Sequence, residues 1–165
     1  MKKNSIFTLK NILYSASVLL AVVAFCMLAV NAFSVTQSAT ILGQTVENTT
    51  VYTGVQAVFG KENALAFSFM NLLSYIFVFA GVVLALLRVF GVLKSKIFDY
   101  VIVALFVVAA VFFFLTIQFV VWDADLKSVL DLAKSTYALG AGPIVAGILS
   151  ILSAGCVAVA STRKK

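Results

Sequence analysis

The chain has 165 residues, of which 63% are hydrophobic and only 11% are charged. An ordinary soluble domain has about 45–50% apolar and about 25% charged residues, so these charges are too few to cover an apolar core in water. The composition excludes a soluble globular domain, a disordered chain and a disulfide scaffold, and it predicts an integral membrane protein. The sequence has no His and two cysteines, Cys26 and Cys156. We therefore expect no cofactor, no metal site and no catalytic residue.

Four mostly apolar runs without charges set the predicted fold. Three of them fit the roughly 20 residues that a helix needs to cross a bilayer; the first is longer, but its strongly apolar part ends at Phe33. Their hydrophobicity is continuous rather than alternating, which argues against a transmembrane barrel. We predict a single all-α membrane domain over residues 1–165, a four-helix bundle. The expected helices are 11–33, 64–87, 99–121 and 138–160, with loops 34–63 and 122–137 on one side and segments 1–10, 88–98 and 161–165 on the other.

The distribution of basic residues predicts the orientation of the bundle. Lys and Arg are retained on the cytoplasmic side of a membrane, and three basic clusters fall on one side, with Asp99 as the only acid there. Both termini are therefore expected in the cytoplasm of a multi-pass protein of a plasma or bacterial cytoplasmic membrane. These cations would contact anionic lipids, and no sizeable soluble domain offers a face for nucleic acid. The residues are Lys2, Lys3, Lys10, Arg88, Lys94, Lys96, Arg163, Lys164 and Lys165.

Helix one has a competing interpretation as a cleaved signal peptide, with Val30-Asn31-Ala32 as the cleavage site. The apolar stretch from Ile12 to Val30 has 19 residues, which is longer than the 7–15 residues of a signal-peptide core. Retention as a membrane anchor is therefore favoured.

The first outer loop, 34–63, has the composition of a small β-hairpin. The runs TILGQTV and TTVYTGV are rich in β-branched residues, and Glu47-Asn48 lies between them as the expected turn. An isolated hairpin is marginal in water, so we expect it to rest on the second loop or on another protein. Asn48-Thr49-Thr50 also matches a glycosylation acceptor, although a three-residue pattern often arises by chance.

The second outer loop, 122–137, has the pattern of a short amphipathic helix. Leu126, Val129, Leu130 and Ala133 recur at helical spacing, and the helix is expected to lie in the membrane interface or to cover the hairpin. Trp122 and Tyr137 at its two ends suit the headgroup level.

Two sets of residues inside the bundle are candidate sites. A ridge of small residues follows helix four and would allow close helix packing, either within the chain or between copies. A second set of polar residues would form an outward-facing pocket if their faces converge; otherwise these residues bond one another or anchor the loops. The predicted ridge is Gly142, Ala146, Ser150, Ala154 and Ala158, and the predicted pocket is Asn31, Ser68, Asn71, Thr116 and Gln118.

No ionisable residue is expected deep in the membrane, whereas ion-coupled pumps usually keep one there. The nearest candidate is Asp99 at the start of helix three. We interpret it as a cap or anchor that can pair with Lys94 or Lys96.

The layout of four spans, cytoplasmic termini and a long first loop is similar to that of claudins and other tetraspan proteins. The first loop has no Trp and no Cys, so the claudin pattern in that loop is missing. Small four-span multidrug exporters are a second comparison, but their intramembrane glutamate has no counterpart here. We expect a non-enzymatic structural or accessory protein with a membrane-protein partner or a homo-oligomer. The alternative is a small oligomeric transporter or channel subunit; an enzyme is least favoured because no base could activate a nucleophile.

Overall fold

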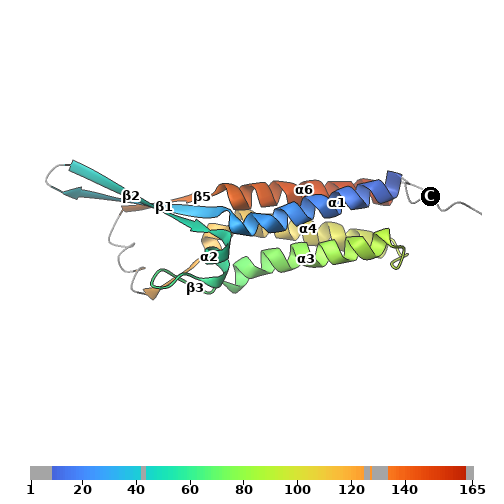
Figure 1. Cartoon of the computed structure of the whole chain (residues 1–165), viewed down its shortest axis with the longest axis horizontal. Coiled ribbons are helices and arrows are strands. Elements are labelled where there is room, and N and C mark those ends of the chain that lie inside the picture. The colour runs from blue at the N-terminus through green and yellow to red at the C-terminus, as the bar shows by residue number, and fades with distance from the viewer. Residues whose placement is uncertain (1–8, 42–43, 125–126, 128–133, 163–165) are drawn as a thin grey trace, which may run out of the picture.

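Four long helices form the body of the protein (Figure 1). The computed structural model describes residues 9–41, 44–124, 127 and 134–162, without the side chains of 39–41, 44, 45 and 134. The helices contain 18 to 22 residues, or about 27–33 Å at 1.5 Å per residue. All four are long and apolar enough to cross a membrane. They are α1 (Leu9–Cys26), α3 (Phe69–Val89), α4 (Ile97–Phe114) and α6 (Ala141–Thr162).

Each long helix packs against two neighbours. Helix α1 lies against α3 and α6, and α4 lies against the same two helices. The core between them contains Tyr14, Val78, Phe106 and Val157. Large apolar side chains also cover the outside of the helices, as Leu19 (68% exposed) and Phe79 (60% exposed) show. An apolar exterior of this kind suits hydrocarbon rather than water.

The two ends of the bundle differ. Helix α1 begins and α6 ends at the same end as the loop between α3 and α4, which we call the loop end (Figure 1). The strands rise from the opposite end, which we call the sheet end. The four helices therefore pass between the two ends an even number of times.

A three-stranded antiparallel sheet extends beyond the sheet end of the bundle (Figure 1). It contains β1 (Asn31–Ile41), β2 (Gln44–Thr53) and β5 (Lys134–Leu139), in the order β2-β1-β5. The predicted hairpin is thus present, and the second loop supplies the third strand. The expected turn is wrong, because Glu47 and Asn48 pair with Ser38 and Gln37 inside the ladder. The strands are instead joined across 42–43, which lie outside the described residues.

Short elements connect the sheet to the helices. The 3₁₀ turn η1 (Met27–Ala29) follows α1, and α2 (Gly54–Phe59) returns the chain from β2. A second 3₁₀ turn, η2 (Thr116–Phe119), follows α4. The pair β3 (Leu65–Ala66) and β4 (Val121–Trp122) forms a small second sheet.

Several of the predicted boundaries are wrong. The second helix was expected from residue 64, but β3 comes first and α3 begins at Phe69. The third was expected to reach 121, but α4 ends at Phe114. The fourth was expected from 138, but that residue belongs to β5 and α6 begins at Ala141.

The first helix was expected to reach residue 33, but α1 ends at Cys26 and β1 begins at Asn31. Ala32 and Phe33 belong to β1 and are buried in the apolar cluster at the base of the sheet. Hydropathy does not distinguish a buried strand of this kind from a helix.

The expected amphipathic helix over 122–137 is also not continuous. Its first residue belongs to β4, and Lys134–Leu139 forms β5 along the free side of β1. Most of the intervening pattern, 125–126 and 128–133, lies outside the described residues. Ala124 and Lys127 are helical, and the Lys127 N–H donates to the Asp123 carbonyl at 2.9 Å. For the rest of that stretch the helix remains a prediction.

Glycines allow two aromatic rings to pack directly on helix backbones. A Cβ atom on Gly81 would lie 2.6 Å from the Phe106 ring, and one on Gly147 would lie 2.7 Å from the Phe114 ring. These rings join α3 to α4 and α4 to α6. By contrast, a Cβ atom on Gly155 would meet nothing within 4 Å.

These environments make a matched pair of substitutions on α6. Gly147→Ala should lower the free energy of unfolding by about 1–3 kcal/mol, because the Phe114 ring must shift. Gly155→Ala should be neutral or stabilising by up to about 1 kcal/mol, since Ala favours helix more than Gly. Thermal unfolding in detergent measures both. Equal melting temperatures for the two variants would contradict the packing of the Phe114 ring on Gly147.

Candidate functional site

None of the five residues of the predicted polar pocket lines the apolar cavity between α1, α2 and α3. The Ser68 hydroxyl donates to the Phe119 carbonyl at 2.5 Å, and the Thr116 hydroxyl donates to the Phe113 carbonyl at 2.7 Å. Asn31 and Gln118 are exposed at the sheet end. The buried hydroxyls therefore tie turns to helices, which is the anchoring role that the sequence had left open.

Asn71 holds α2 against the start of α3. Its side-chain nitrogen donates to the Ala57 carbonyl at 3.2 Å, one of the last carbonyls of α2, which lack partners within the helix. The other end of α2 is closed by a capping box between Thr53 and Gln56. The Asn71 Oδ1 atom is buried and has no hydrogen-bond partner among the described residues.

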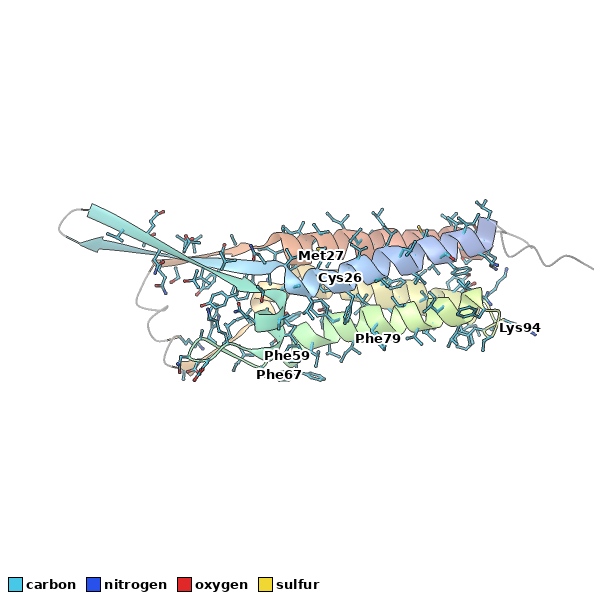
Figure 2. All side chains as sticks on the ribbon, in the orientation of Figure 1. Cys26, Met27, Phe59, Phe67, Phe79 and Lys94 are labelled. Carbon is cyan, nitrogen blue, oxygen red and sulfur yellow. The ribbon has the colours of Figure 1, made fainter. Side chains whose placement is uncertain are left out.

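One cavity at the sheet end is lined by apolar side chains. It has a volume of about 220 Å³ and lies between α1, α2 and α3. Figure 2 shows two of its lining residues, Phe59 of α2 and Phe79 of α3, on the same side of the molecule. The lining residues are Phe25, Leu28, Val58, Phe59, Leu72, Tyr75, Ile76 and Phe79.

The predicted ridge on α6 is mostly buried. Gly142, Ala146, Ser150 and Ala154 face the interior, whereas Ala158 is exposed and Val157 and Ala160 are buried near it. The ridge leaves the interior in the last turns because 3.6 residues per turn carries an i+4 series slowly around a helix. A Cβ atom on Gly142 would lie 2.9 Å from the Asn31 carbonyl oxygen. The part of the ridge near the sheet end therefore packs within the chain.

Two serines that the sequence analysis did not single out join α1 to α6. The Ser17 hydroxyl donates to the Ser153 carbonyl at 3.0 Å, and the Ser153 hydroxyl lies 3.1 Å from the Ser17 carbonyl. Both side chains are fully buried. Small polar residues in membrane helices often bond across an interface in this way.

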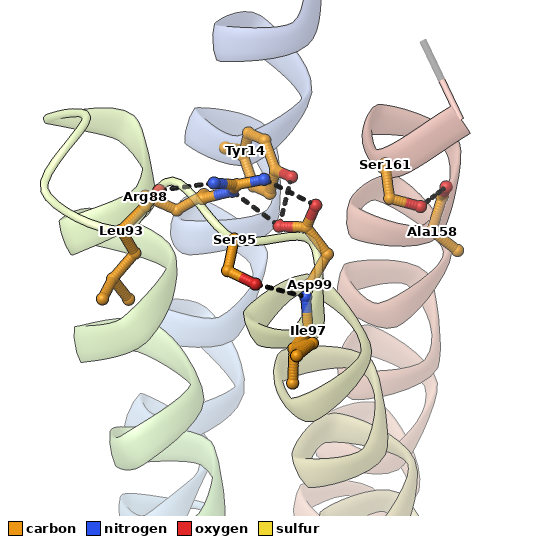
Figure 3. A network of polar contacts seen from close by, with 8 residues as sticks. All are labelled: Tyr14, Arg88, Leu93, Ser95, Ile97, Asp99, Ala158 and Ser161. Atoms are coloured by element: carbon orange, nitrogen blue, oxygen red, sulfur yellow. Dashed lines mark hydrogen bonds and ion pairs between the residues drawn. The ribbon is translucent and has the colours of Figure 1, made fainter. Parts of the chain in front are cut away.

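An ion pair closes the loop end (Figure 3). Arg88, in the last turn of α3, donates from Nε to Asp99 Oδ1 at 2.7 Å and from a terminal nitrogen to Oδ2 at 2.8 Å. The Tyr14 hydroxyl of α1 donates to the same Oδ1 at 2.7 Å, and Arg88 also donates to the Leu93 carbonyl. The carboxylate is fully buried, and the arginine side chain is 8% exposed. Three helices thus meet at one charged group.

The expected partner of Asp99 is therefore wrong. Lys94 and Lys96 are exposed, while Arg88 makes the two-pronged contact that a planar guanidinium allows and a lysine ammonium does not. Asp99 still lies in the first turn of α4, where an anion is favourable. A signal was present in the sequence: an Arg in the last turn of one apolar run precedes an Asp in the first turn of the next.

An aromatic cluster supports the base of the sheet. Phe33 stacks on Tyr52 with ring centroids 5.0 Å apart, and Trp122 contacts both rings edge-on. Tyr137 of β5 packs 5.7 Å from Trp122, and the Lys61 ammonium lies 5.3 Å from the Tyr52 ring centroid. Burial raises the pKa of the Tyr52 phenol. The cluster fixes the two connecting segments at the sheet end to one another.

The chain matches no protein-family model, no curated protein and no solved structure. Among the described residues, no group of three or more His, Cys, Asp or Glu side chains could hold a metal ion.

Breaking the ion pair at the loop end should be costly. Asp99→Asn or Arg88→Gln should each lower the free energy of unfolding by about 3–5 kcal/mol, because each leaves a buried charge without its partner. The double variant Arg88→Met with Asp99→Leu should cost less than either single change. Thermal unfolding in detergent reports all three.

Lys94→Gln provides the control, since it removes an exposed charge from the same loop. If the single variants had the same melting temperature as Lys94→Gln, a structural role for the ion pair would be contradicted.

Proposed function

We propose that the protein is a non-enzymatic four-span membrane protein that serves a structural or accessory role through its sheet and its helix-packing faces. One observation carries this proposal: the buried polar side chains at the sheet end donate to main-chain carbonyls and tie α2, η2 and α3 together. The sheet that these contacts support is built from both outer loops and projects beyond the helices. Such a surface is suited to contact with another molecule.

The sequence supports the same role. It lacks His entirely, and the buried carboxylate at Asp99 is already bound by Arg88 and Tyr14. A hydroxyl nucleophile needs a neighbouring base. The serines of the bundle instead bond to main-chain carbonyls, as Ser17, Ser74 and Ser150 do.

The proposed site of action is a cell membrane, with the loop end in the cytoplasm and the sheet outside. Exposed Lys94 and Lys96 at the loop end support this orientation. They are also placed to contact anionic lipid headgroups.

One observation favours the transport alternative. The Asn71 Oδ1 atom is buried without a hydrogen-bond partner among the described residues, and such an atom could receive a donor from a solute. A small oligomeric transporter or channel would use it.

Orientation can be tested by labelling single cysteines in a background of Cys26→Ala and Cys156→Ala. Asn63→Cys should react with an impermeant maleimide from outside intact cells, and Ser95→Cys should react only after the membrane is opened. Both positions are exposed, at opposite ends of the bundle. The reverse labelling pattern would contradict the proposed orientation.

Flux and cross-linking separate the two functional proposals. Proteoliposomes should pass small solutes no faster than empty vesicles, and amine cross-linking in native membranes should join Lys61 or Lys127 to one recurrent foreign protein. Flux that Asn71→Leu abolishes at a normal protein level, together with cross-links only between copies, would favour the transporter.

A matched variant controls for the effect of Asn71→Leu on stability. Gln118→Leu changes an exposed amide at the same end and should not affect stability. Asn71→Leu should lower the melting temperature, because it leaves the Ala57 carbonyl of α2 without a donor.

A further inference from the structure

Strand β2 forms one edge of the sheet. It pairs with β1 over nearly its whole length, from Gln44 to Thr53, and with no other described strand. On its other side, alternate residues therefore direct their N–H and C=O groups away from the sheet. Side chains along 46–51 are exposed or half-exposed. We call residues 46–51 the open edge.

The open edge has little of the usual protection of an edge strand. Natural sheets protect their edges with charged side chains, especially Lys, with Pro, with bulges or with very short strands. The sequence VENTTV contains one charge, Glu47, but no Pro and no Lys. The irregularity in the ladder lies between Asn31 and Phe33, away from these residues. The opposite edge, β5, is shorter and begins with Lys134. The open edge is thus the better template for another strand.

One charge marks the open edge. Glu47 is exposed and forms no ion pair with a described residue. In the same row of the sheet Ser38 pairs with Glu47 on one side and with Lys134 on the other. The backbones of Glu47 and Lys134 are therefore two strand spacings apart, about 9–10 Å. A strand added at the open edge would lie one spacing from Glu47, so a cation there would be complementary to it.

Strand direction decides which partner fits. Both edge strands, β2 and β5, run toward the helices, and β1 runs away from them. A second copy in the same membrane, rotated about the membrane normal, keeps these directions and offers only parallel edges. Parallel pairs are less stable and occur mainly in sheets covered on both faces. An antiparallel partner must instead run away from the helices.

In a copy that faces this one from an opposite membrane, strand β2 would run in the antiparallel direction. Such a copy is nevertheless a less suitable partner than a segment of another protein. Two β2 strands related by a twofold axis would bring two uncompensated Glu47 side chains to one seam. A like charge at such a seam is unfavourable.

We propose that the open edge of β2 binds, by antiparallel strand addition, an extended segment of another protein that runs away from the helices and carries Lys or Arg opposite Glu47. Main-chain hydrogen bonds supply affinity in this mode of recognition, and the alternate side chains supply specificity. The inference rests on the proposed accessory function and names the kind of partner that this function would use.

The test uses the full-length protein in detergent and a labelled nine-residue peptide of alternating Thr and Val with Lys at its centre. Fluorescence anisotropy should show saturable binding, and a peptide with Glu at the centre should bind about tenfold more weakly. The protein variant Glu47→Lys should reverse that preference. Because Glu47 is exposed, this variant should fold normally.

A second pair of variants tests the backbone contact. Of Asn48→Pro and Thr49→Pro, one removes an N–H that points to β1 and the other removes one that points outward. The variant that keeps the wild-type melting temperature should lose peptide binding.

Three results would overturn the proposal: no saturable binding, equal binding of the Lys and Glu peptides, or dimerisation of the protein alone through β2. If the peptide fails while native cross-links from Lys61 or Lys127 still capture one foreign protein, only the edge proposal fails. Solute flux that depends on Asn71 would instead reject the accessory function itself.

Discussion

The close contact between α1 and α6 organises the whole molecule. Near the middle of the bundle, the Ser17 hydroxyl donates to the Ser153 carbonyl, and the Ser153 hydroxyl lies between the Leu149 and Ser17 carbonyls. At the sheet end Gly142 packs against the Asn31 carbonyl, and the Gly140 N–H donates to the Ala32 carbonyl at 2.7 Å. The chain leaves α1 into β1 and enters α6 from β5, so the two helices that pack together continue as two strands that pair together. The sheet is therefore an extension of one helix pair.

The two ends of the bundle satisfy their polar groups by different means. At the loop end a single carboxylate, Asp99, binds a guanidinium and a phenol from two other helices. At the sheet end many weaker contacts, from Ser68, Asn71 and the rings around Trp122, share the same task. A charge pair suits the end with few connecting residues, whereas the longer segments at the sheet end have enough chain to build a second core of their own.

The helices could be predicted from the sequence because span length and charge are local counts, and a run of twenty apolar residues needs no partner to be recognised. The end of α1 was not predictable in this way, since Ala32 and Phe33 are apolar because they are buried in the cluster at the base of the sheet. Strand β5 was missed because a strand depends on its neighbour, and the edge that accepts it lies about a hundred residues earlier in the chain. Ser68, Asn71 and Thr116 were expected to line a pocket, or else to bond one another or anchor the loops. They are buried and their partners are main-chain carbonyls, which sequence patterns do not specify.

The continuity of α1 with β1 has a mechanical consequence. A pull on the hairpin along the axis of the bundle slides β1 past β5 and loads all hydrogen bonds of that ladder at the same time, because antiparallel bonds lie across the strands. A sideways pull on β2 instead opens its ladder one bond after another from the tip. The sheet therefore resists tension directed away from the helices far better than peeling, and load applied along β1 passes directly into α1.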